Sequence, residues 1–145
     1  MSAKVLDSFA LIAYFRDEPG AETVENLLVA AGKKDSPLHM TDVNYAEVKY
    51  SVVKKDGAAA WEEAAKVLQG LPIEFHSTTR ALADSAADFK ARFKISLADA
   101  FAAALAQEKR AELVTGDPEF KPLEKETTIS WLSINHSGSS ARRTR

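Results

Sequence analysis

Four carboxylic acids stand in otherwise apolar stretches of this chain, where an ionised side chain is costly to bury. The four are Asp7, Glu47, Asp99 and Asp117. Asp7 and Ser8 interrupt residues 5–15, in which the other nine residues are apolar or aromatic. Asp99 is the only charged residue among residues 97–106. A buried carboxylate needs hydrogen bonds, a cation or a metal ion to replace its lost hydration. This recurring pattern is typical of a functional site.

Each acid also has a purely structural explanation when it is considered alone. Asp117 precedes Pro118, which is a usual way to begin a helix. Asp99 follows Ser96 by three residues, which is the spacing of a capping box. Asp7 can equally cap the helix that follows it in the chain. Glu47 can pair with a neighbouring lysine on the surface. Taken singly, every acid therefore leaves the structural explanation open.

The elements that must position these acids alternate between strands and helices. Strands are predicted at residues 4–7, 38–41, 71–75, 112–115 and 127–132. Helices are predicted at residues 8–15, from 21 to just before Gly32, from a cap at Thr41 or Asp42 to Asp56–Gly57, at 58–69, from Thr78 or Thr79 to 93, at 97–106 and briefly after Pro118. Such alternation indicates an α/β fold built on a parallel sheet. The helix at 97–106 is apolar almost all round, which predicts that it is buried.

In this layout the four acids converge on one edge of the sheet. Ligands bind beyond the carboxyl ends of parallel strands, and Asp7 and Asp117 stand at two such ends. Carboxylates that share a small space raise one another's pKa unless cations neutralise them. Oxygen-only ligands suit Mg²⁺ or Mn²⁺ rather than Zn²⁺. Because such ions activate water and hold phosphates for in-line displacement, the sequence predicts a divalent-metal phosphodiesterase or phosphotransfer site.

Length and composition narrow the class of protein. The 145 residues fit one domain, and the absence of cysteine excludes disulfides and thiolate metal sites and favours a cytoplasmic location. No signal peptide is apparent, and the apolar run at 5–15 is too short to span a membrane.

The chain has 19 basic and 21 acidic residues, with three of the arginines among the last four residues. A nucleic-acid substrate would therefore need local basic patches or bridging cations. Residues 134–145 are predicted to form a disordered tail.

Rival functions lack their expected residues. A phosphatase with an aspartyl nucleophile would carry a second aspartate two residues after the first, where Phe9 stands. A nucleotide-binding module would need a glycine-rich phosphate loop, and none is present. The three histidines, His39, His76 and His136, share no spacing and are interpreted as surface or strand-end residues.

Four segments together resemble the PIN domain, and most closely the VapC-type toxins of bacterial toxin–antitoxin pairs. They are residues 5–8, 41–47, 96–100 and 113–117, which occur in the order of the family. The resemblance covers about residues 1–133. It implies a three-layer α/β/α domain with a central parallel sheet of four to five strands. Pro118, after the last acid, is a mild departure from the family pattern.

The resemblance also implies roles for particular residues. Asp7, Glu47, Asp99 and Asp117 match the four acids of a nuclease site that binds Mg²⁺ (or Mn²⁺). Asp7 and Asp99 are the expected direct ligands, with Glu47 and Asp117 holding metal-bound waters or a second ion. Ser8 and Thr115 match supporting hydroxyl positions, and Asn44, one helical turn before Glu47, is expected to be a supporting neighbour of the site.

The implied function is that of a toxin that hydrolyses RNA phosphodiester bonds, with tRNA or ribosomal RNA as substrate classes. Its expected partners are a VapB-like cognate antitoxin that inhibits it and a second copy in a homodimer. The alternatives are a catalytically silent PIN-type binding module and a metal-dependent phosphatase on a similar fold. A silent module is expected to lack one or more of the acids, and here all four are present.

Overall fold

Strands and helices alternate through residues 3–133, which are the residues that this computed structural model describes. The elements are β1 (Lys4–Leu6), α1 (Ser8–Arg16), α2 (Ala21–Lys34), β2 (Leu38–Thr41), α3 (Asp42–Asp56), α4 (Ala58–Gln69), β3 (Ile73–His76), α5 (Arg80–Arg92), α6 (Leu97–Lys109), β4 (Glu112–Thr115), the 3₁₀-helix η1 (Pro118–Lys125) and β5 (Ile129–Trp131). Within this range, no helix is both long and apolar enough to cross a membrane.

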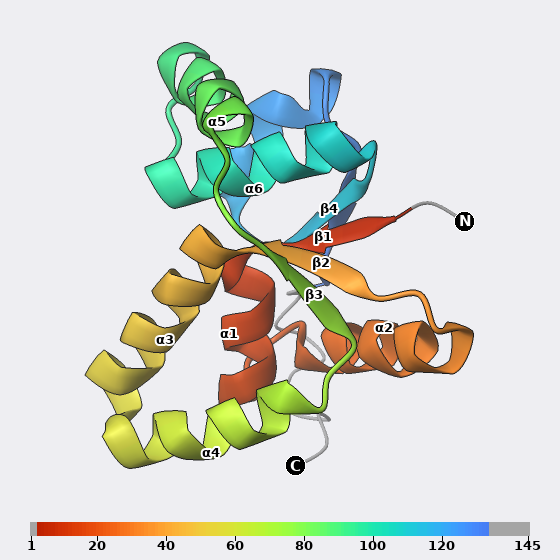
Figure 1. The fold of residues 1–145 in the computed structure, drawn as a ribbon, viewed down its shortest axis with the longest axis vertical. Coiled ribbons are helices and arrows are strands. Elements are labelled where there is room, and N and C mark those ends of the chain that lie inside the picture. Colours follow the sequence, from red (N-terminus) through yellow and green to blue (C-terminus); the bar gives the residue numbers. More distant parts are fainter. Residues whose placement is uncertain (1–2, 134–145) are drawn as a thin grey trace.

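The five strands form one parallel sheet in the order β3-β2-β1-β4-β5. Helices α1 to α4 lie on one side of it, and α5, α6 and η1 lie on the other (Figure 1). The predicted three-layer α/β/α architecture is thereby confirmed, with five strands. Because all strands run the same way, their carboxyl ends meet at one edge.

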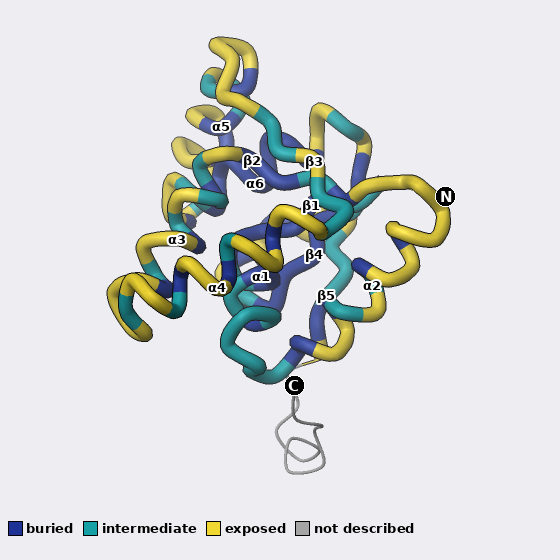
Figure 2. Tube along the Cα trace, turned by 60° about the horizontal axis from the view of Figure 1, so that its bottom comes forward, coloured by how far each residue is buried: buried dark blue, intermediate teal, exposed yellow. Residues whose placement is uncertain are grey.

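The two faces of the sheet support two apolar cores, because side chains alternate along a strand. Val5 and Leu113 pack with α5 and α6, whereas Leu6 and Val114 pack with the helices of the opposite layer. Helix α6 lies between the sheet and α5, and residues 100–106 are all buried. The prediction of a buried helix is confirmed. Figure 2 shows the same contrast between buried central segments and outer helices with exposed faces.

Several element boundaries differ from the predicted ones. Helix α2 does not end before Gly32 but continues to Lys34 and ends at Asp35, whose φ is 53°. Asp35 donates its backbone N–H to the carbonyls of Ala31 and Gly32, and lysines in the last turn suit the negative end of the helix dipole. Strand β3 begins at residue 73 rather than 71, and β5 is shorter than predicted at both ends. The predicted tail at 134–145 lies outside the described residues.

Candidate active site

Asp7 follows β1 directly and caps α1. Its Oδ1 accepts the backbone N–H of Ala10 at 2.9 Å, and its Oδ2 accepts the hydroxyl of Thr115 at 2.5 Å. The side chain is only 1 % exposed. The capping explanation is therefore correct, but a cap alone does not require a carboxylate to be buried so completely.

Burial raises the pKa of Asp7 to about 8. The nearby carboxyls of Asp99 and Asp117 raise the pKa further, while the hydrogen bonds from Thr115 and Ala10 lower it. Without a cation, Asp7 consequently keeps its proton at neutral pH. A side chain that is uncharged when alone and charged when a cation arrives is suited to metal binding.

Asp99 lies in the first turn of α6 and meets two other acids. Its backbone N–H donates to the cap hydroxyl of Ser96 at 3.1 Å. Carboxylate oxygens of Asp99, Asp117 and Glu119 lie within 4.8 Å of one another. Burial first, and then Asp117 and Glu47, raise the pKa of Asp99 to about 7. Three carboxylates at this spacing could hold one cation between them.

Thr115, the last residue of β4, links two of the acids. Its buried Oγ1 donates to Asp7 and accepts the backbone N–H of Asp117 at 3.0 Å. Asp117 in turn caps η1 by accepting the N–H of Glu119 at 2.9 Å. One hydroxyl thus fixes the orientation of the first acid and the position of the last.

Asn44 is fully buried, and its side chain forms hydrogen bonds to residues that neighbour the acids in the chain. Its Nδ2 donates to the hydroxyl of Ser8 at 2.9 Å and to the carbonyl of Ala98 at 3.1 Å. Its Oδ1 accepts the hydroxyl of Thr41 at 2.6 Å, and the same hydroxyl accepts the backbone N–H of Asn44. Ser8 directly follows the first acid and Ala98 directly precedes the third. The hydrogen bonds of this side-chain amide therefore join α1, β2 and α6. Asn44 supports the site and is not placed to be a ligand in it.

Glu47 lies one helical turn beyond Asn44 on α3 and is half-buried. It lies outside the group of three mutually close carboxylates, but it is near enough to raise the pKa of Asp99. The structure therefore places all four predicted acids at the carboxyl edge of the sheet. It brings Asp99 and Asp117 together, with Asp7 and Glu47 beside them.

Glu119 belongs to this site and was missed by the sequence reasoning. It stands two residues after Asp117 in the first turn of η1 and is exposed. An acid in a first turn is ordinarily explained by the helix dipole, so its position gave no distinct signal. The available signal was its closeness in sequence to an acid already singled out.

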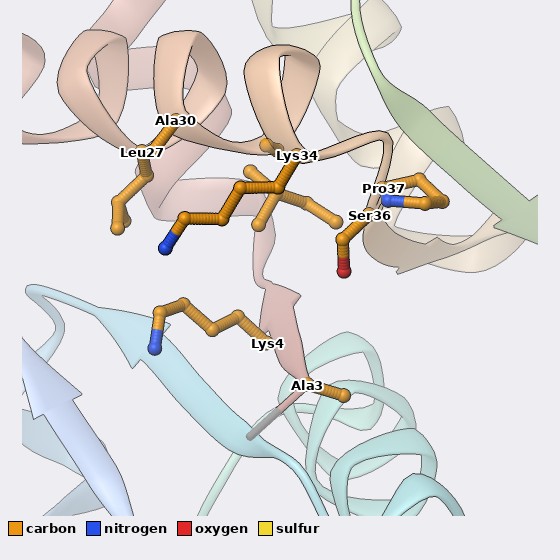
Figure 3. Close-up of a pocket in the computed structure, with 9 residues that line it drawn as sticks. Ala3, Lys4, Leu27, Ala30, Lys34, Ser36 and Pro37 are labelled. Carbon is orange, nitrogen blue, oxygen red and sulfur yellow. The ribbon is translucent and has the colours of Figure 1, made fainter. Parts of the chain in front are cut away.

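A pocket of about 470 Å³ lies away from these acids, at the opposite edge of the sheet (Figure 3). It opens between α2 and the start of β1, and its lining includes Leu27, Lys34 and Lys4. The candidate active site is assigned instead on chemistry, since among residues 3–133 only the acidic edge combines buried carboxyls with raised pKa values. The donor set there is all oxygen, which fits Mg²⁺ or Mn²⁺.

Comparisons with known proteins agree with this geometry. The family model "PIN domain" matches residues 4–126. Among solved structures, the chain is similar to VapBC2 from Rickettsia felis bound to a promoter DNA fragment, with 16 % identity, a TM-score of 0.72, and coverage of 90 % of this chain and 99 % of that chain.

Two further structures have the same fold. VapC20 from Mycobacterium tuberculosis, a sarcin-ricin loop cleaving toxin, has 17 % identity, a TM-score of 0.68, and coverage of 83 % of this chain and 95 % of that chain. A toxin–antitoxin complex from Klebsiella pneumoniae has 21 % identity, a TM-score of 0.62, and coverage of 82 % and 91 %. The comparison with curated proteins gave no match.

Proposed function

Because the chain belongs to the PIN domain family, we propose that it is a divalent-metal-dependent endoribonuclease and the toxin of a VapC-type toxin–antitoxin pair, acting in the cytoplasm. The observation that carries the proposal is the cluster of acids at the carboxyl edge of the sheet. Burial and mutual repulsion raise the pKa of Asp7 to about 8 and of Asp99 to about 7. Such a cluster is disfavoured in the charged state unless a cation is bound.

Each acid has a proposed role. Asp7 and Asp99 hold the cation directly, and Glu47 and Asp117 position its waters or a second ion. Thr115 keeps Asp7 in a fixed orientation, and each carboxylate oxygen of Asp7 retains a second lone pair for a ligand bond. When bound, Mg²⁺ or Mn²⁺ supplies a water of lowered pKa and positive charge against the phosphate. Glu119 adds a further carboxylate at the exposed side.

The proposed reaction is hydrolysis of an RNA phosphodiester bond, leaving a 5′-phosphate and a 3′-hydroxyl. The similar structure of a toxin that cleaves the sarcin-ricin loop supports structured RNA as the substrate class. The presence of all four acids favours a nuclease over a catalytically silent binding module.

The proposed partner is a VapB-like antitoxin that covers the acidic site. An arginine of that partner suits it, because a planar guanidinium can bind two carboxylate oxygens at once. Helix α3 also exposes apolar surface that a partner can cover, since Tyr50 is 59 % and Val53 37 % exposed. The similar structures that are toxin–antitoxin complexes support this assignment. We also propose that two copies of the chain form a homodimer. This part of the proposal rests on the family resemblance.

Cleavage of structured RNA by the purified chain tests the proposal. Wild type should cut tRNA or a ribosomal RNA loop in the presence of Mg²⁺ or Mn²⁺. This cleavage should stop when EDTA removes the metal ion. Asp99→Asn should be inactive although folded, whereas Asp84→Asn, a matched change of an exposed acid on α5, should retain full activity. If wild type and Asp99→Asn cut the same substrate equally, or if EDTA has no effect, the proposal is wrong.

A further inference from the structure

A second group of metal-ligating side chains lies in the sheet itself, apart from the acidic site. His39 stands on β2, and Glu74 and His76 stand on the adjacent edge strand β3. His39 pairs in register with Glu74, and His76 is two residues beyond Glu74 on the same strand. Since residues two apart on a strand share a face, the three side chains point to the same side of the sheet. The sequence spacing gave no sign of this meeting, because it depends on the strand register.

The three side chains bring their donor atoms together. Nδ1 of His39 and Nε2 of His76 share a hydrogen bond of 2.9 Å, and Nε2 of His76 is 3.9 Å from a carboxylate oxygen of Glu74. One donor atom from each residue lies within 4.8 Å of the others. Ligands about 2.0–2.1 Å from a tetrahedral zinc ion are about 3.3 Å apart. The observed separations lie on either side of that value, so small side-chain rotations would open the space for an ion.

The chemistry and exposure of the group also suit an ion. Two imidazoles and one carboxylate are a common protein ligand set for zinc, with a fourth position left to water. The side chain of His76 is 16 % exposed and that of Glu74 is 55 % exposed, so an ion can enter from solvent.

We propose that His39, Glu74 and His76 form a Zn²⁺ site that ties the edge strand β3 to β2. The site differs from the acidic one in its ligands, because imidazole nitrogen favours zinc over Mg²⁺. It is independent of the proposed nuclease activity. A ligand that binds only the folded state stabilises it, so Zn²⁺ should raise the melting temperature of the chain.

A plain hydrogen bond between the two rings is the competing explanation, and Glu74 distinguishes the two. That hydrogen bond does not need Glu74, whereas the proposed ion does. Glu74→Gln keeps the shape of an exposed side chain while removing its charge, and it should leave metal-free stability close to wild type. It is therefore the informative variant if His39→Gln or His76→Gln fails to fold.

The experiment is a titration of the full chain, stripped of metal and held in excess Mg²⁺ to occupy the acidic site. Wild type and the control His136→Gln should bind one equivalent of Zn²⁺, and Co²⁺ should give the intense visible bands of tetrahedral coordination. His76→Gln and Glu74→Gln should lose those bands and the zinc-dependent rise in melting temperature. The proposal is overturned if wild type binds no Zn²⁺, if its Co²⁺ spectrum is not tetrahedral, or if Glu74→Gln binds as tightly as wild type.

Discussion

Replacing Asp7 with asparagine should stabilise the metal-free protein, although it removes a residue of the proposed catalytic site. Asparagine has nearly the same shape, and its Oδ1 can still accept the N–H of Ala10 that Asp7 accepts at 2.9 Å. The change removes a buried carboxyl whose charged form is strongly disfavoured. Asp7→Asn should therefore raise the free energy of unfolding of the metal-free protein and weaken its metal binding.

The size of the effect follows from the raised pKa. The ordinary value of 3.8 for an unfolded aspartate rises to about 8 in the folded chain. Because the folded state holds the proton more tightly, the stability from this group is complete below about pH 4 and is lost as the pH rises toward 8. At pH 7 that loss is about 4 kcal/mol, at about 1.4 kcal/mol per pKa unit.

The hydrogen bond from Thr115 reduces the expected gain. The amide of the new asparagine would donate where Asp7 accepts, so the Thr115 hydroxyl loses its acceptor, at a cost of about 1–3 kcal/mol. A net gain of about 2 kcal/mol at pH 7 remains. For a domain of this length, that corresponds to a melting temperature roughly 5 °C higher. Near pH 4 the gain should vanish or change sign.

Thermal unfolding in EDTA between pH 4 and pH 8.5 measures this dependence. The control is Asp84→Asn, which removes the same charge from an exposed position on α5. The stability difference between Asp7→Asn and wild type should grow with pH far more than that of the control. With Mn²⁺ in place of EDTA, the melting temperature of wild type and of the Asp84→Asn control should rise, and that of Asp7→Asn should not. A difference that stays constant across this pH range would refute the reasoning.

Three further predictions follow from the site. Asp99→Asn should abolish RNA cleavage and leave the circular dichroism spectrum unchanged; a fully active variant would remove Asp99 from the proposed mechanism. Asn44→Ala should lower the free energy of unfolding by about 3 kcal/mol in a urea titration, because buried partners lose their hydrogen bonds. A loss below 1 kcal/mol would show that Asn44 is not a structural hub. In a complex with the cognate antitoxin, replacing the arginine that enters the acidic site should restore cleavage more than it weakens binding, because apolar burial should hold most of the affinity. Cleavage by the intact complex at the rate of the free chain would contradict inhibition by site occupancy.

Much of this architecture could be predicted because local patterns determine it. The apolar spacing and the residues that end each element predicted the strand at 38–41 and the helix at 58–69 correctly. They also placed the start of the helix between them at Thr41 or Asp42, and Thr41 is the observed cap. The acids could be placed at one edge because parallel strands end together. Asp7 was conspicuous because it is a charge within an apolar run.

The remaining features depend on contacts between distant segments. Asn44 was expected as a neighbour of the acids, but its role in joining Ser8, Thr41 and Ala98 follows only from the packing of α1, β2 and α6. The meeting of His39 with His76 follows from the register of β2 and β3. Neither relation leaves a periodic trace in the sequence.

The buried amide of Asn44 has a consequence for biosynthesis. Its partners come from segments that leave the ribosome at widely separated times, and the last of them, Ala98, opens α6. A nascent chain that has not yet released α6 has Asn44 without its full set of hydrogen bonds and lacks both Asp99 and Asp117. The carboxylate cluster therefore cannot assemble while only the elements from β1 to α5 have been translated. The metal binding that we propose at the acidic site becomes possible only near completion of the domain, after Asp99 and Asp117 have left the ribosome.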